Sequence, residues 1–216
     1  MHAERRHALV RGIAIGMAWM LPSALRAQAA FDLVQLMGTL AQVKAGEATF
    51  VERRTVAILE RTLESSGRLS FEAPDTFVRE TLKPRRERVA VVGNNVTMSL
   101  GQRSRTVPLD SVPEAAVIME AIRGTLTGNR DAIERHFNAT VSGNAQQWSL
   151  ELVPREPRLR ELVIAVRVAG RQAVVREMTV ALADGDKSVM TIEPAAAGLR
   201  TIEPAAAPAK PASAAS

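Results

Sequence analysis

The sequence predicts a mainly β protein with helices (α+β), in which an antiparallel sheet forms a curved, unclosed barrel covered by a helical lid. Short apolar runs separated by turn residues fill 48–109 and again 137–192, which is typical of antiparallel strands. Two amphipathic segments precede and interrupt these runs, and such helices cover the apolar face that a curved sheet must bury. If the helices fit loosely, a cavity for an apolar ligand remains between the two layers.

Three helices are expected. The first spans Phe31–Lys44, where apolar residues recur at helical spacing, and Gly46 ends it. The second spans Pro113–Leu126, because Pro113 suits a first helical turn and Gly128 follows the last one. A short third helix follows over 129–136.

The strands are expected in two groups, one on each side of the second helix. Turn signals separate them, among them Ser65-Ser66-Gly67, Gly93-Asn94-Asn95 and Asp184-Gly185. The expected strands are Ala48–Leu59, Gly67–Phe71, Phe77–Leu82, Arg88–Val92, Val96–Leu100, Thr106–Leu109, Phe137–Val141, Trp148–Val153, Leu162–Val168, Ala173–Leu182 and Ser188–Ile192.

The two ends of the chain differ from this middle part. Residues 1–29 combine a basic start, the apolar run Gly12–Leu21 and the small-residue site Ala27-Gln28-Ala29, which are the three regions of a secretory signal peptide. The alternative is an uncleaved anchor, although the apolar run is too short to span a bilayer. Residues 195–216 are rich in Ala and Pro and predict a disordered tail. We therefore expect an exported protein, cleaved near Ala29, with one domain over 30–194.

Composition excludes several function classes. The 216 residues include no cysteine and only three histidines, of which His136 alone lies beyond the first ten residues. Zinc hydrolase sites and Ser/His/Asp triads both need histidine, so we expect no enzymatic activity, no metal and no cofactor. Of the net charge of +5, residues 1–29 carry +3, and the remaining +2 comes from a region in which arginines are interleaved with acids. Aromatic residues make up only 3% of the chain. No nucleic-acid partner is expected from this pattern.

A spaced pattern of glycine, proline and apolar residues points to a family. Its members are Gly67, Leu69, Pro74, Phe77, Pro84 and Gly93. This pattern resembles that of the periplasmic lipoprotein carrier family, LolA and its relatives. The resemblance extends over residues 31–193 and is that of a divergent member. It implies an unclosed barrel with a helical lid, whose cavity shields acyl chains in transit between two membranes.

The resemblance also implies partners and a location. It implies lipoprotein acyl chains or another lipid as cargo, an inner-membrane donor complex, an outer-membrane acceptor, and a monomer working in the periplasm. The family's lead member carries an arginine just before the first proline, where this chain has Ala73. Arg79 is the candidate replacement, and Glu114 or Glu120 on the second helix is the candidate partner in a polar latch that releases cargo.

The expected cavity residues are apolar and come from the first strands and the second helix. They are Phe50, Leu69, Phe71, Phe77, Leu82, Val91, Met98, Leu100, Val117, Ile118, Met119 and Ile122. For most of them, an ordinary core position is the alternative interpretation. The alternative function is therefore an envelope interaction or sensor module with the same fold and a filled core.

Overall fold

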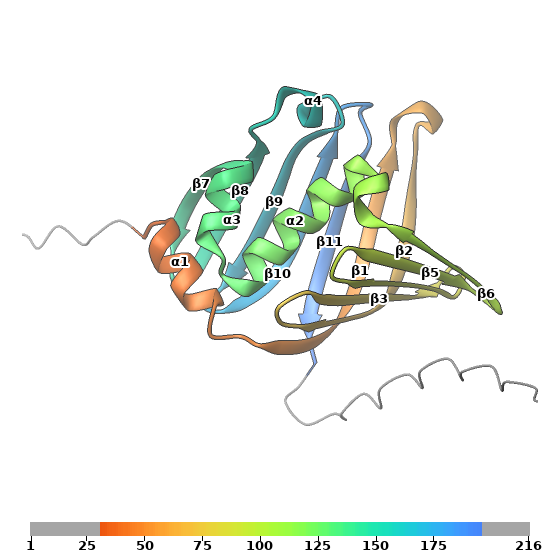
Figure 1. The fold of residues 1–216 in the computed structure, drawn as a ribbon, viewed down its shortest axis with the longest axis horizontal. Helices are drawn as coiled ribbons and strands as arrows, with labels where there is room; N and C mark the ends of the chain where they lie inside the picture. Colours follow the sequence, from red (N-terminus) through yellow and green to blue (C-terminus); the bar gives the residue numbers. More distant parts are fainter. Residues whose placement is uncertain (1–30, 196–216) are drawn as a thin grey trace, which may run out of the picture.

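A computed structural model describes residues 31–195 of the chain. The expected signal peptide, and the expected tail beyond residue 195, lie outside the described residues. The strands of the described part form one eleven-stranded antiparallel sheet in the order β6-β5-β4-β3-β2-β1-β11-β10-β9-β8-β7 (Figure 1). Within this part β6 and β7 are the two edges and do not pair with each other, so the curved sheet stays unclosed, as the sequence predicts.

The strands follow the expected order along the chain. They are β1 (Ala45–Val56), β2 (Arg61–Glu72), β3 (Thr76–Lys83), β4 (Glu87–Val92), β5 (Asn95–Leu100), β6 (Arg103–Pro108), β7 (Phe137–Asn144), β8 (Gln147–Pro154), β9 (Val163–Arg171), β10 (Val174–Leu182) and β11 (Lys187–Pro194). The first and last strands of the chain, β1 and β11, pair in the middle of the sheet and join its two halves.

The turn expected at Ser65-Ser66-Gly67 is wrong. The chain reverses earlier, where Glu60 adopts a left-handed conformation with φ of 48°. Strand β2 then continues through the three small residues, because β2 pairs with β1 along its whole length, Ser65 and Gly67 included. Gly67 is needed there, since a Cβ at this position would lie 1.9 Å from the carbonyl oxygen of Glu80. Strand pairing has overridden the local turn signal.

Helices α1 (Leu33–Leu40), α2 (Pro113–Thr127) and α3 (Arg130–His136) lie on the concave side of the sheet (Figure 1). The Asp32 side chain caps α1 by accepting a 2.9 Å hydrogen bond from the Gln35 amide. Helix α1 is shorter than expected, and the short helix α4 (Pro157–Arg160) was not expected. None of the helices within residues 31–195 is long and apolar enough to cross a membrane.

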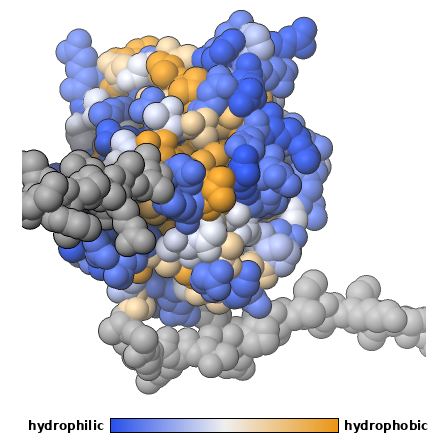
Figure 2. Space-filling model, turned by 90° about the vertical axis from the view of Figure 1, so that its left-hand side faces the viewer, coloured by the Kyte–Doolittle hydropathy of each residue, from blue (hydrophilic) through white to orange (hydrophobic). Residues whose placement is uncertain are grey.

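The main core fills only one half of the space under the helices. It joins α1, α2 and α3 to β7–β10, and its largest fully buried side chains include Trp148, Phe137, Leu150 and Leu152. In the other half, around β1 and β2, a cluster of three buried residues forms: Phe50, Leu69 and Met190. Seen from the α1 and β7 side, polar side chains cover most of the visible surface, with a band of apolar ones between them (Figure 2).

Gly128 fixes the corner at which α2 ends against α1. Its φ of +64° is left-handed, and a Cβ there would lie 2.3 Å from the Met37 carbonyl oxygen and 2.5 Å from the Ala41 amide nitrogen. Both the backbone conformation and the close approach of the helices therefore require glycine.

We expect Gly128→Ala to lower the free energy of unfolding by about 1–3 kcal/mol, because the helices must separate to admit the methyl group. The matched control is Gly38→Ala in α1, where nothing lies within 4 Å of the added Cβ. That change should raise stability by about 0.5–1 kcal/mol. Urea unfolding of both variants measures this, and equal effects would contradict the close packing at Gly128.

Candidate functional site

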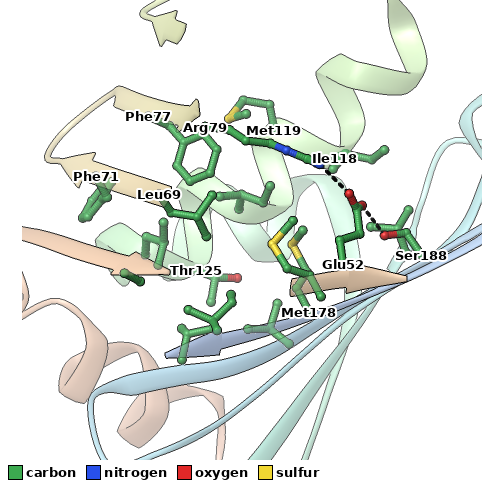
Figure 3. A pocket seen from close by; sticks show the side chains of 18 of the residues that line it. Glu52, Leu69, Phe71, Phe77, Arg79, Ile118, Met119, Thr125, Met178 and Ser188 are labelled. Carbon is green, nitrogen blue, oxygen red and sulfur yellow. Dashed lines mark hydrogen bonds and ion pairs between the residues drawn. The ribbon is translucent and has the colours of Figure 1, made fainter. Parts of the chain in front are cut away.

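A cavity of about 670 Å³ lies between helix α2 and the β1–β4, β10 and β11 part of the sheet (Figure 3). Its wall is mainly apolar. Ile118, Met119 and Ile122 line it from α2, and Leu69 and Phe77 line it from the sheet. The volume falls within the usual range of small-molecule sites, about 300–1,000 Å³.

The cavity exists because α2 packs tightly on one half of the sheet only. Val117 and Ala121 of α2 are buried in the main core with the large side chains of β7 and β8. Ile118 and Met119, at neighbouring positions of the helix, stay partly exposed and line the cavity. One helix therefore completes the core on one side and leaves the cavity open on the other.

Seven of the apolar residues expected in a cavity line this one. They are Leu69, Phe71, Phe77, Val91, Ile118, Met119 and Ile122. They come from β2, β3, β4 and α2, and Figure 3 shows the labelled members converging from the sheet and the helix.

The other five apolar residues do not line the cavity. Phe50 packs in the small cluster with Leu69 and Met190, and Val117 packs in the main core. Leu82 lies on the opposite face of β3, since Phe77, Arg79 and Thr81 of that strand line the cavity and strand residues alternate. Met98 and Leu100 lie on β5, outside the cavity, and each is 39% exposed.

Sequence reasoning missed the contribution of the last two strands. Met178, Val180 and Leu182 of β10 line the cavity, as do Met190 and Ile192 of β11. The alternation of these residues was a usable signal, because every second residue of a strand shares a face. What the sequence alone does not reveal is that β11 pairs with β1 and so brings this face beside the earlier strands.

A polar cluster interrupts the apolar wall. The guanidinium group of Arg79 on β3 donates hydrogen bonds to the carboxylate of Glu52 on β1 and to the Ser65 hydroxyl, the latter at 3.1 Å. The Ser188 hydroxyl donates to the other Glu52 oxygen (Figure 3). Cζ of Arg79 also lies 4.7 Å from the centre of the Phe50 ring, a cation–π contact. This cluster places a neutralised ion pair inside the cavity.

The expected latch between Arg79 and the second helix is not formed. Arg79 pairs with Glu52 in the sheet, where the side chains of the pair are only 28% and 14% exposed. Glu120 instead lies 4.0 Å from Arg123 on its own helix and does not line the cavity. Glu114 does line the cavity, at the start of α2, without an ion pair to any described residue. The sequence could not reveal Glu52 as the partner, because strand pairing alone brings it near Arg79.

Glu52 is charged in this setting. Burial raises its pKa, but the hydrogen bond from Ser188, the positive charge and hydrogen bond of Arg79, and the hydrogen bond from Ser65 outweigh burial and lower the pKa below its usual value. A carboxylate with a lowered pKa is a weak base, which does not suit proton abstraction. Within residues 31–195, no cluster of His, Cys, Asp or Glu is arranged to hold a metal ion.

We expect Glu52→Gln to be less stable than the wild type at pH 7, with the difference shrinking as the pH falls below about 4.3. The lowered pKa means that folding favours the charged carboxylate, so its stabilisation is present above the unfolded pKa and is lost as the pH falls through the folded one. Urea unfolding between pH 7 and pH 3 tests this. The control is Glu64→Gln, whose pair with Arg53 is 61–72% exposed and should contribute little. A difference that does not change with pH would contradict the assignment.

Comparison with solved structures finds similar proteins at low identity. A LolA superfamily protein from Nitrosomonas europaea is 8% identical, with a TM-score of 0.40, covering 76% of this chain and 92% of that one. A putative outer membrane lipoprotein-sorting protein domain from Vibrio parahaemolyticus is 13% identical, with a TM-score of 0.41, covering 78% and 92%. The MucA/MucB complex of Pseudomonas aeruginosa gives 13% identity, a TM-score of 0.43, and coverage of 74% and 55%.

The family comparison covers most of the chain. No curated protein matches it. The family model described as "Outer membrane lipoprotein carrier protein LolA-like" matches residues 25–213, which include the whole described sheet and its helices. That match supports a lipid- or lipoprotein-binding domain of the cell envelope. The chain belongs to the LolA-like family of outer membrane lipoprotein carrier proteins, as a divergent member.

Proposed function

We propose that this protein is a periplasmic carrier that shields the acyl chains of a lipoprotein or lipid during transfer toward the outer membrane. The observation that carries the proposal is the apolar cavity of about 670 Å³ between α2 and the sheet. An acyl chain placed there would be removed from water along its length, which is favourable by about 0.8 kcal/mol per methylene. The open volume favours this function over a sensor module with a filled core.

We also propose that the protein binds without catalysis. The Ser65 and Ser188 hydroxyls both donate to Glu52, which Arg79 neutralises. Glu52 is the only base hydrogen-bonded to these serines in the described residues, and its lowered pKa makes it too weak to activate a nucleophile. A monomer that receives cargo from an inner-membrane donor complex and delivers it to an outer-membrane acceptor fits this role.

The polar cluster gives the proposal a release mechanism. A long acyl chain in a wholly apolar cavity would bind too tightly to be handed over. The Glu52–Arg79 pair occupies part of the wall and offers the chain no apolar contact. The pair therefore limits cargo affinity in the cavity itself, whereas the latch expected from the sequence would have acted through the helix.

We expect Met119→Asp to abolish binding of a fluorescent long-chain fatty acid, because the change places a charge in the apolar wall beside the ligand. The control is Ile164→Asp, since Ile164 lies on β9 outside the cavity and is 52% exposed. Fluorescence titration measures binding, and thermal melting shows that both variants are folded. Wild-type affinity in folded Met119→Asp would contradict the proposed site.

We expect the double variant Glu52→Leu/Arg79→Leu to bind the same fatty acid about tenfold more tightly and to transfer it more slowly to acceptor liposomes. The two leucines add apolar contact worth about two methylenes, and removing both partners leaves no unpaired charge. Arg79→Leu alone should instead lower stability by about 1–3 kcal/mol, since it leaves the Glu52 carboxylate buried without its partner. Unchanged affinity and transfer in the double variant would contradict the release mechanism.

A further inference from the structure

The ends of four strands form a basic projection away from the helices. Strands β3–β6 run outward beyond α2 at the right of Figure 1. The turn between β3 and β4 and the turn between β5 and β6 lie at the same end, because Arg88 pairs with Ser99 and Leu100 pairs with Arg103. We call residues 83–88 and 98–105 the basic tip. Its exposed basic residues are Lys83, Arg85, Arg86, Arg88, Arg103 and Arg105.

The positive charge of the basic tip is not neutralised within the described part of the chain. None of its six basic residues forms an ion pair with another described residue. The basic tip itself contains one acid, Glu87, which lies opposite Thr81, and Glu80 on the neighbouring strand lies opposite Arg88. Residues 31–195 hold 22 Lys and Arg against 21 Asp and Glu, so the rest of the domain is acidic overall. The charge is therefore segregated toward this end.

Exposed apolar side chains lie among these cations. Strand register places Val89, Met98 and Arg105 side by side on the face of the sheet that lines the cavity, and Leu100 follows Met98 on that face. Met98 and Leu100 are each 39% exposed. Val89 lines the cavity, so the apolar surface continues from the cavity out to the basic tip.

We propose that the basic tip docks on an anionic phospholipid bilayer, with Met98 and Leu100 entering the headgroup region. Basic residues gain about 1 kcal/mol each near an anionic membrane surface, and interleaved apolar side chains add burial at the interface. The projecting shape favours a membrane over an acidic protein partner, since two separated apolar side chains on a strand end bury little area against a protein. Docking here would place the cavity beside the bilayer, and it does not depend on the identity of the cargo.

The test is flotation of the full chain with phosphatidylcholine vesicles, with and without added phosphatidylglycerol. We expect binding only to the anionic vesicles, and Arg85→Gln/Arg86→Gln should weaken it about thirtyfold. The matched control is Arg158→Gln/Arg160→Gln in α4, which removes the same charge from another exposed segment and should have little effect. If both double variants lost vesicle binding equally, the attraction would depend on net charge alone, which would overturn the proposal.

Two single variants complete the test. Met98→Ser should weaken binding several-fold with no change in charge, and no effect would overturn the apolar part of the proposal. Met119→Asp should keep full vesicle binding while losing fatty-acid binding, so a failure of docking and a failure of the cavity proposal are distinguishable. Absence of binding to anionic vesicles overturns the proposal, and retention on an immobilised acidic polypeptide would then assign the basic tip to a protein partner.

Discussion

Burial of the concave face of an open sheet is the constraint on which the rest of this structure depends. A curved antiparallel sheet with two free edges must cover its apolar inner face with other elements. Helix α2 does so only in part. Val117 and Ala121 complete the core over β7–β10, while Ile118, at the edge of that core, and Met119 line the cavity over the other half. Because one helix covers the sheet unevenly, one half of the domain has a filled core that stabilises it. The other half has a cavity of a size suited to a ligand.

Charge is distributed as unevenly as packing. Inside the cavity Arg79 and Glu52 neutralise each other, so the polar part of the wall carries no net charge. At the ends of β3–β6 six cations have no described partner, although the described residues as a whole are almost neutral. The two sites would serve different steps of lipid transfer. A cavity without net charge suits binding of acyl chains, and a cationic projection suits docking on an anionic membrane surface.

The sequence was sufficient for the fold class and insufficient for the pairings between distant segments. Apolar alternation predicted the strands, and Pro113 and Gly128 predicted the two ends of α2. These signals succeed because each acts on the local backbone. The turn expected at Ser65–Gly67 failed because pairing with β1 holds those residues extended. On the helix, Ile118, Met119 and Ile122 were placed correctly. Phe50, Leu82, Met98, Leu100 and Val117 were not, because hydrophobicity alone does not distinguish a core position or another face from a cavity wall. The Glu52–Arg79 pair depends on the order of the strands in the sheet, which no local pattern reveals.

Native mass spectrometry of the gently purified protein is the most direct test of whether the cavity half of the domain holds an acyl chain. We expect a population heavier than the polypeptide by the mass of an acyl lipid. We also expect the remaining lipid-free protein to form such a complex on incubation with lysophospholipid. A spectrum showing only the polypeptide mass, unchanged after that incubation, would contradict the claim.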